Sequence, residues 1–306
     1  MKAEPVADVQ RGLIAILVGG CILGCRPDDV PAQVVEPTHF EVTGVFQTNR
    51  LSESSGIAVS RVLPGVLWTH NDSGDDPWLY AVDSTGALLG TYAVAGARAV
   101  DWEDIALGGC PDSPQPCLYI ADTGDNSGSR ARVDIYVVAE PASLPAPGED
   151  GEALPAHRLR LRYADGPQDV EAVAVTPSGA LLLISKGRRG AIGVYRIQAS
   201  DVLEDSVVVE RIQELDIVPQ RGFGHQVTGA AVSPDGTRAV VRTYIELAFY
   251  HLTEDELLIE GPKCLVAGRE LQGEAVDFID DSTLVLTSEA VLGRRGVISI
   301  VRCPIP

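Results

Sequence analysis

Short apolar runs alternate with turn residues along almost the whole chain of 306 residues. The runs are rich in Val, Ile, Leu and Tyr, clusters of Gly, Pro, Asp and Ser separate them, and helical periodicity is nearly absent. This pattern is typical of an all-β protein. We therefore predict strands throughout and look first for a repeat that would order them.

One pattern recurs five times: a residue with a hydroxyl or carboxylate side chain, one or two small or polar residues, and then a short apolar strand. A second and a third apolar strand follow each copy, with a fainter fourth such as "LLGTYAVA" or "VVVERIQEL". Units of about 40 to 50 residues with four strands each predict the blades of a β-propeller. The residues that begin the copies are called the keyed residues below: Ser55, Glu103, Glu171, Thr228 and Glu274.

The last repeat, which begins at Glu274, leaves room for only three strands before the chain ends. The segment "FEVTGVFQT", Phe40 to Thr48, precedes the first repeat and can supply the fourth. A ring closed in this way exposes no sheet edge. We therefore predict a single five-bladed β-propeller domain over residues 39 to 306, closed by this N-terminal strand. A β-sandwich would not explain five copies of one pattern.

The first 25 residues have a different composition. Lys2 and Arg11 precede an apolar run from Leu13 to Leu23, which is shorter than the roughly 20 residues of a membrane span and suits a signal peptide. The run ends in "ILGC", which resembles the lipobox of bacterial lipoproteins and implies a lipidated Cys25. Cys21 is a weaker candidate.

We therefore expect a signal peptide over residues 1 to 25 and a polar tether over residues 26 to 38. The expected location is the cell envelope, with the chain held in the membrane through Cys25 at the periplasmic or outer-membrane face. An ordinary cleaved signal and a secreted protein are the alternative.

Four cysteines follow the signal segment. Cys110 and Cys117 bracket the turn-rich "PDSPQP", which favours a disulfide between them, and Cys264 and Cys303 would then pair. An even number outside the cytoplasm favours disulfides, and the spacings match no zinc motif.

The net charge is −19, while 45% of residues are apolar and 22% are charged. The apolar share supports a large core and excludes disorder. A chain this acidic should repel nucleic acid and anionic surfaces, and we expect neither a nucleic-acid partner nor a basic stripe. We expect a monomer.

The first strand of each propeller blade lines the central channel, so the keyed residues should converge on the axis. Three carboxylates brought together without a cation would repel one another. Oxygen ligands of this kind suit Ca²⁺, and the absence of His and Cys argues against zinc and copper. Any one Glu could instead be a solvent-facing strand end, but five in register predict an axial Ca²⁺ site.

Polar residues also follow the second strands and should surround one mouth of the channel. Asp72, Lys186, Arg242 and Glu289 occupy such positions, and nearby loops carry arginines at 188, 189, 294 and 295. Arginine and lysine over a Ca²⁺ ion would suit an anionic small-molecule ligand such as a phosphate or carboxylate. The arginine pairs could equally keep hairpin tips soluble. No nucleophile elbow, P-loop or dinucleotide fingerprint occurs.

The order Ser, Glu, Glu, Thr, Glu at the keyed positions resembles that of the soluble calcium-activated nucleotidases (apyrases). "LTSEAVLGRRGVISI" and "THNDSGD" resemble their last and first blades. The resemblance implies a five-bladed propeller with an axial Ca²⁺, but their longer substrate-binding insertions have no counterpart here. The segments "DWED" and "DTGDN" are more similar to uncharacterised bacterial propeller lipoproteins, and loosely to phytase-like propellers, which are Ca²⁺-dependent phosphohydrolases.

Two functions follow from these residues. In the favoured one, the propeller binds a ligand or partner at the channel mouth and Ca²⁺ only holds the blades together. In the alternative, a Ca²⁺-dependent phosphohydrolase, Lys186 and Arg242 neutralise developing charge while Asp72 or Glu289 accepts the proton of the attacking water. A structural role in envelope assembly is a third class.

Strand alternation makes a finer prediction for "DWED". Trp102 and Asp104 should share one side of their strand, while Asp101 should lie on the side of Glu103. This leaves Asp104 as the one acid of the segment without an assigned role.

Overall fold

The computed structural model describes residues 33–219, 224–253 and 256–304, which belong to one compact unit beginning at Ala32. The predicted signal segment, with Cys21 and Cys25, lies outside the described residues. Within these ranges the regular elements are strands and one 3-10 helix, η2 (Ala199–Asp201), joined by turns and loops, so the all-β prediction is confirmed. No helical segment of the described chain has the length and hydropathy needed to cross a bilayer.

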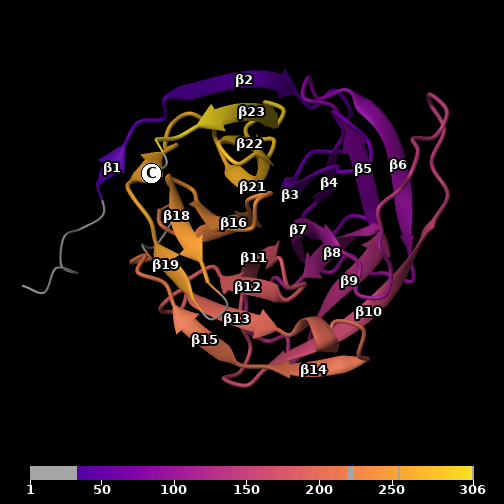
Figure 1. Ribbon diagram of the computed structural model, residues 1–306. Helices are drawn as coiled ribbons and strands as arrows, with labels where there is room; N and C mark the ends of the chain where they lie inside the picture. The colour runs from indigo at the N-terminus through magenta and orange to yellow at the C-terminus, as the bar shows by residue number, and fades with distance from the viewer. Residues whose placement is uncertain (1–32, 220–223, 254–255, 305–306) are drawn as a thin grey trace, which may run out of the picture. The chain divides into compact units, whose positions relative to one another are not determined.

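Four sheets surround a common centre (Figure 1). One four-stranded sheet runs outward in the order β11 (Val170–Val175), β12 (Leu181–Ser185), β13 (Gly193–Ile197) and β15 (Arg211–Glu214). Another contains β21 (Gly273–Asp280), β22 (Thr283–Ser288), β23 (Val297–Arg302) and β2 (His39–Val45).

The other two sheets are larger. The six-stranded sheet has the order β16 (Val227–Val232), β17 (Arg238–Thr243), β18 (Glu246–Leu252), β20 (Lys263–Leu265) and β1 (Val34–Val35), with β19 (Leu257–Ile259) also paired to β18. The nine-stranded sheet has the order β3 (Ser54–Val59), β4 (Leu67–Asn71), β5 (Trp78–Val82), β6 (Leu88–Ala95), β10 (Leu154–Tyr163), β9 (Val133–Ala139), β8 (Pro116–Asp122) and β7 (Trp102–Gly109), with β14 (Ser206–Val209) paired to β10.

The five innermost strands form a ring. β3, β7, β11, β16 and β21 each contact the next one, and β21 contacts β3. Small residues make this close approach possible: a Cβ added at Gly56 would lie 2.6 Å from the backbone nitrogen of Ile105, and one at Gly229 would lie 2.9 Å from the carbonyl oxygen of Glu274.

The outer strands join neighbouring units. β10 pairs in parallel with both β6 and β14, while β1 pairs in parallel with β20 and β2 pairs antiparallel with β23. The prediction of one strand over "VVVERIQEL" is wrong, because β14 and β15 bond to different neighbours, β10 and β13. Val34 and Val35 lie inside the segment predicted as a tether, so a tether would end before them.

Both predicted disulfides are present. Cys110–Cys117 closes the β7–β8 hairpin, and Cys264–Cys303 joins β20 to the residue that follows β23. Disulfides of this kind are typical of proteins that fold outside the cytoplasm.

Candidate metal-binding cavity

Each keyed residue occupies a β-bulge at the start of an innermost strand. The pairing register skips one residue between Ser54 and Gly56 in β3, and the same irregularity recurs at the corresponding point of β7, β11, β16 and β21. A bulge leaves one residue out of the ladder and redirects its side chain. All five keyed residues are buried, with at most 5% of their surface exposed.

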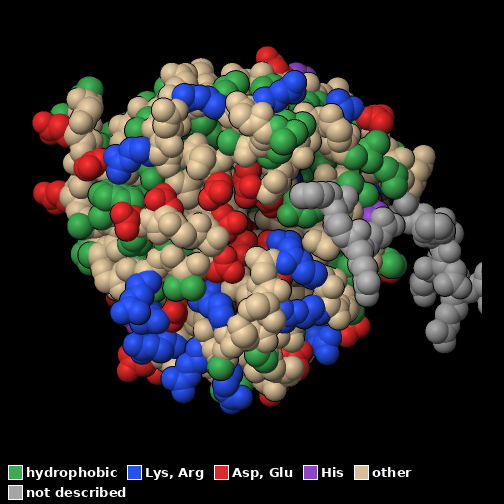
Figure 2. Space-filling view, turned by 180° about the vertical axis from the view of Figure 1, so that it is seen from behind, with side chains coloured by type: hydrophobic (Ala, Val, Ile, Leu, Met, Phe, Trp, Pro, Cys, Tyr) green, Lys and Arg blue, Asp and Glu red, His purple; other side chains and the backbone are tan. Residues whose placement is uncertain are grey.

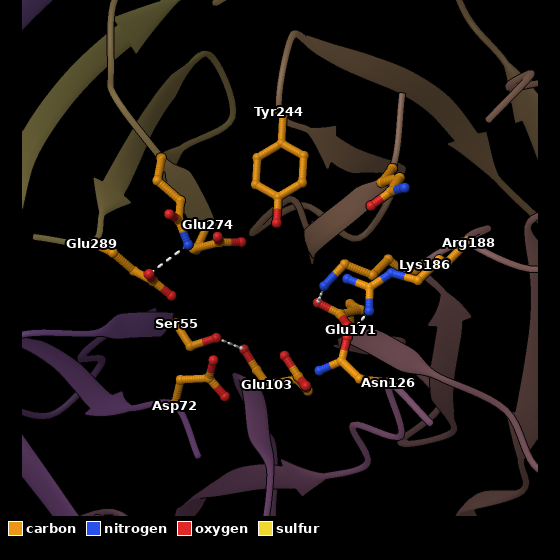
Figure 3. Close-up of a pocket in the computed structure, with 12 residues that line it drawn as sticks. Ser55, Asp72, Glu103, Asn126, Glu171, Lys186, Arg188, Tyr244, Glu274 and Glu289 are labelled. Atoms are coloured by element: carbon orange, nitrogen blue, oxygen red, sulfur yellow. Dashed lines mark hydrogen bonds and ion pairs between the residues drawn. The ribbon is translucent and has the colours of Figure 1, made fainter. Parts of the chain in front are cut away.

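A cavity of about 600 Å³ opens beside the bulges. Four keyed residues line it, and Thr228 is not among the lining residues. Acidic side chains gather in this hollow in the middle of the face shown in Figure 2, and Figure 3 shows how they converge from different strands. The other described residues that line it are Asp72, Asn126, Lys186, Arg188, Gln226, Tyr244, Gln272 and Glu289, so five carboxyl groups face two cations among the described lining residues.

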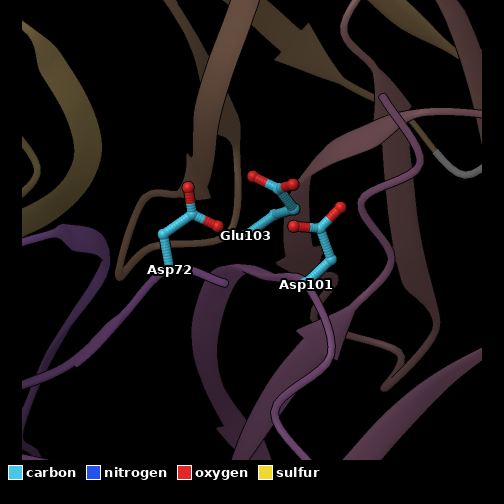
Figure 4. Close-up of side chains that lie close together, drawn as sticks. All are labelled: Asp72, Asp101 and Glu103. Atoms are coloured by element: carbon cyan, nitrogen blue, oxygen red, sulfur yellow. The ribbon is translucent and has the colours of Figure 1, made fainter. Parts of the chain in front are cut away.

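Glu103 belongs to two groups of carboxylates that are close enough to share an ion. Ligand oxygens of Asp72, Asp101 and Glu103 lie within 4.8 Å of one another (Figure 4), and so do those of Glu103, Asp169 and Glu171. An all-oxygen set of this kind fits a hard divalent cation. The Oε1 atom of Glu171 is buried and has no hydrogen-bond partner among the described residues.

The two hydroxyl residues of the keyed set differ from this pattern. Ser55 Oγ donates a hydrogen bond to the carbonyl oxygen of Glu103 at 2.6 Å, so its proton is directed at the backbone. Thr228 Oγ1 is buried without a hydrogen-bond partner among the described residues. Glu274 is in neither carboxylate group. The two carboxylate groups thus meet at Glu103, near the starts of β7 and β11, whereas Glu274 and Glu289 line another part of the cavity.

Lys186 occupies the same side of the cavity. Its Nζ lies 2.7 Å from Glu171 Oε2, and both side chains are buried. Burial lowers the pKa of Lys186, but the carboxylates of Glu171 and Glu103 outweigh it and leave this pKa raised. The ammonium therefore stays charged and neutralises only part of the acid around it.

The carboxyl groups of the cavity hold their protons more tightly than usual. Burial first, and then Glu289, raises the pKa of Glu274 to about 8. Burial followed by Asp72 raises the pKa of Glu289 to about 7, and the same two causes raise that of Asp101 to about 6. Burial and Glu171 raise the pKa of Glu103 well above its usual range. The uncompensated charge of the cavity therefore favours a bound cation or proton.

The predicted mouth residues separate in the structure. Asp72, Lys186 and Glu289 line the cavity, whereas Arg242 lies outside it. Arg242 is only 1% exposed, donates to the carbonyl oxygens of Ala275 and Thr287, and pairs with Glu270. The guanidinium of Arg242 therefore ties β17 to β21 and β22.

The segment "DTGDN", Asp122 to Asn126, packs against the carboxylates of Asp101 and Glu103. A Cβ added at Gly124 would overlap Glu103 Oε1 and crowd Asp101 Oδ2, so only glycine leaves them their space. Asp125 accepts backbone hydrogen bonds from Ser129 and Arg130 at 2.8 and 3.0 Å, so its carboxylate closes its own turn.

Sequence reasoning missed Asp169, although a signal for it exists. In every repeat the residue two positions before the keyed one carries a side-chain oxygen, and alternation places it on the same side of the strand and nearer the mouth. These residues are Glu53, Asp101, Asp169, Gln226 and Gln272. Tyr244, which points into the cavity in Figure 3, follows no such rule.

The bulge also changes the prediction for "DWED". Trp102 packs in the core and donates its Nε1–H to the carbonyl oxygen of Arg98 at 3.0 Å. Asp104 instead accepts hydrogen bonds from the backbone amides of Val173 at 2.9 Å and Ala230 at 3.4 Å, on β11 and β16. Simple alternation fails here because the extra residue shifts the register, and Asp104 gains one partner on the adjoining strand β11 and another on β16, the next strand of the ring.

The comparisons with known proteins do not assign this chain to a family. No protein-family model and no curated protein matches it. Among solved structures, the PQQ-bound aldose sugar dehydrogenase of Streptomyces coelicolor is 15% identical with a TM-score of 0.49, over 86% of this chain and 98% of that one. The major Malassezia sympodialis allergen Mala s 1 is 11% identical with a TM-score of 0.46, over 81% and 78%. Neither likeness bears on function.

Proposed function

We propose that the chain is a five-bladed β-propeller that holds Ca²⁺ in its acidic cavity and binds a ligand or partner at the channel mouth. In this proposal β2 completes the last blade through its pairing with β23. The observation that carries the metal proposal is the convergence of Asp72, Asp101, Asp169 and Glu171 on Glu103. Relative to the predicted axial set, the ion lies off the axis.

Ca²⁺ fits this set better than its competitors. It takes six to eight oxygens in irregular geometry, whereas Mg²⁺ needs a near-ideal octahedron and zinc prefers nitrogen and sulfur. Buried carboxylates with raised pKa values release protons when the ion binds, so its affinity should increase with pH. When bound, Ca²⁺ would supply positive charge to the mouth, where Lys186 and Arg188 already lie.

The test is Ca²⁺ binding by calorimetry, together with thermal unfolding in Ca²⁺ and in EDTA. At 100 times Kd, binding should stabilise the fold by about 2.7 kcal/mol. Glu103→Gln should abolish the Ca²⁺ response, because Glu103 belongs to both carboxylate groups. Glu289→Gln, in the same cavity but outside both groups, should retain it. A native protein indifferent to Ca²⁺, or a Glu103→Gln variant that responds normally, would reject the site.

A second candidate function is Ca²⁺-dependent phosphate ester or anhydride hydrolysis. The observation that favours it is Glu289, whose pKa of about 7 suits a group that exchanges a proton near neutral pH. Because Arg242 lies outside the cavity, charge neutralisation would fall to Lys186 and Arg188. Phosphate release from ATP, ADP, UDP and phytate, with Ca²⁺ and with EDTA, tests it. Absence of release from all four would leave ligand binding as the function.

The proposed location is the cell envelope, through lipidation of Cys25, and the two disulfides support an oxidising compartment. Cys25→Ser should move the protein from the membrane fraction to the soluble fraction. Persistence of the variant in membranes would reject the anchor.

A further inference from the structure

A group of arginines lies on the outer surface, away from the cavity. In β10 the residues Leu159, Leu161 and Tyr163 are buried, while Arg160 and Arg162 between them are exposed. Alternate residues of a strand share one side, about 6.6 Å apart. The two guanidinium groups therefore project from the same side of β10 at a regular spacing.

These guanidinium groups have no acidic partner in the described part of the chain. Arg158, on the same side of β10, forms a two-bond ion pair with Asp134, at 2.8 and 2.7 Å. No ion pair within residues 33–219, 224–253 and 256–304 involves Arg160, Arg162 or the exposed Arg132 beside them. The guanidinium groups of Arg132, Arg160 and Arg162 thus remain available to bind a ligand from solution.

The arginines line a groove rather than a flat surface. β14 pairs in parallel with β10, in the register Arg160↔Ser206 and Arg162↔Val208, and a hollow of about 390 Å³ lies along these strands. Figure 2 shows Lys and Arg gathered at its lower left, the region of β10 and β14 in Figure 1. The residues that line the groove are Arg132, Arg160, Leu161, Arg162, Asp205, Ser206, Val207 and Val208.

We propose that this groove binds an extended anionic glycan whose units carry sulfate or phosphate groups. Guanidinium forks bind such oxyanions through paired hydrogen bonds. The regular spacing along β10 suits a polymer with repeated charges, and Asp205 and Ser206 can bond to sugar hydroxyls. Among the described residues that line the groove there is no aromatic ring, so they offer no platform on which the bases of a single-stranded nucleic acid could stack.

The groove corrects the expectation that the chain has no basic stripe. Net charge averages over the whole surface, whereas a polyanion senses charges within a Debye length of about 10 Å at 0.1 M salt. A protein with a net charge of −19 should be repelled by a polyanion unless a local cluster holds it. Retention on an anionic matrix is therefore a demanding test.

The test is salt elution of the full chain from immobilised heparin at pH 7. The native protein should be retained at low salt, and Arg160→Ser/Arg162→Ser should flow through. The matched control, Arg61→Ser/Arg302→Ser, makes the same charge change at two other exposed positions and should elute with the native protein. Because the groove is independent of the cavity, Glu103→Gln should also be retained.

Three results would overturn the proposal. The native protein could flow through at low salt, or both double variants could lose retention equally, which would indicate a net-charge effect. Alternatively, single-stranded DNA or phosphatidylglycerol vesicles could bind as tightly as heparin with the same dependence on Arg160 and Arg162. That result would reject a glycan as the specific ligand.

Discussion

Lys186 Nζ and Glu171 Oε2 form a buried ion pair at 2.7 Å inside a cavity that holds four further carboxyl groups. The ammonium occupies part of the space and supplies part of the charge that a bound cation would supply. Lys186 and Ca²⁺ should therefore act as partial competitors for Glu171.

Lys186→Met tests this competition. Removing one member of a buried ion pair costs about 3 to 5 kcal/mol, so the melting temperature in EDTA should fall. The Ca²⁺ affinity should rise, because Glu171 Oε2 becomes free to bind the ion. Calorimetry and thermal unfolding measure the two effects separately. An unchanged or weaker affinity would show that Lys186 does not compete for the site.

The pH dependence of stability should differ with and without Ca²⁺. In the folded state the pKa of Glu274 is about 8 and that of Glu289 about 7, both above the usual 4.5. The folded state therefore holds these protons more tightly, and its stability in EDTA should fall as pH rises from about 4.5 to 8. A Ca²⁺ ion bound beside Glu103 would supply to the cavity the positive charge that these protons supply at lower pH, so its stabilising effect should be largest at pH 8 and above. Chemical denaturation at several pH values tests this.

His70 acts in the opposite direction at lower pH. It is fully buried, and burial lowers its pKa from 6.5 to about 4. The unfolded state takes up the proton first, so this contribution to stability is complete above pH 6.5 and is lost as pH falls towards 4. In EDTA the two trends together predict a stability maximum near pH 4.5, because above that value the two carboxyl groups outweigh His70, whereas below it only His70 still changes the stability. A steady rise in stability down to pH 4 would contradict the role of His70.

Gly124→Ala should disturb the proposed metal site while preserving the fold. The new Cβ would overlap Glu103 Oε1, and such overpacking typically costs about 1 to 3 kcal/mol. We expect at least a tenfold loss of Ca²⁺ affinity by calorimetry. Gly109→Ala is the matched control, because no atom of the described residues lies within 4 Å of a Cβ added at Gly109. Equal effects of the two substitutions would remove Gly124 from the site.

Asp104→Ala should destabilise the ring without changing Ca²⁺ affinity. The carboxylate of Asp104 accepts amide hydrogen bonds from β11 and β16, and losing a buried acceptor leaves these donors unpaired. We expect a loss of about 2 to 4 kcal/mol in urea denaturation, with Asp104→Asn losing less. If the alanine variant were as stable as the native protein, these bonds would contribute little.

Much of the strand pattern could be predicted from the sequence because the same motif, a keyed residue followed by short apolar strands, recurs five times. The keyed residues all occupy equivalent positions, and both disulfides follow from cysteine positions. The bulges could not be predicted from the sequence, because a register shift is a property of two paired strands and cannot be recognised in the sequence of either strand alone. For that reason alternation placed Asp104 on the wrong side.

Two further errors have a common physical origin. Arg242 was predicted at the mouth because it ends a second strand, but its long side chain reaches between the sheets to Glu270. The sequence predicts a single strand over "VVVERIQEL", but its first part, β14, pairs with β10 of the neighbouring repeat. In both cases a partner distant in sequence determines the outcome, and local pattern contains no information about it.

The same β-bulge recurs in all five innermost strands, but the side chains at the five bulges are not chemically equivalent. Identical acids at all five bulges would create a five-fold symmetric site with five equivalent binding positions for a cation. Here a serine and a threonine interrupt the acids, while Asp101 and Asp169 reinforce the two neighbouring glutamates on β7 and β11. In the proposed site this broken symmetry would give a cation one preferred position, beside Glu103, and a ligand at the mouth would face an asymmetric cavity.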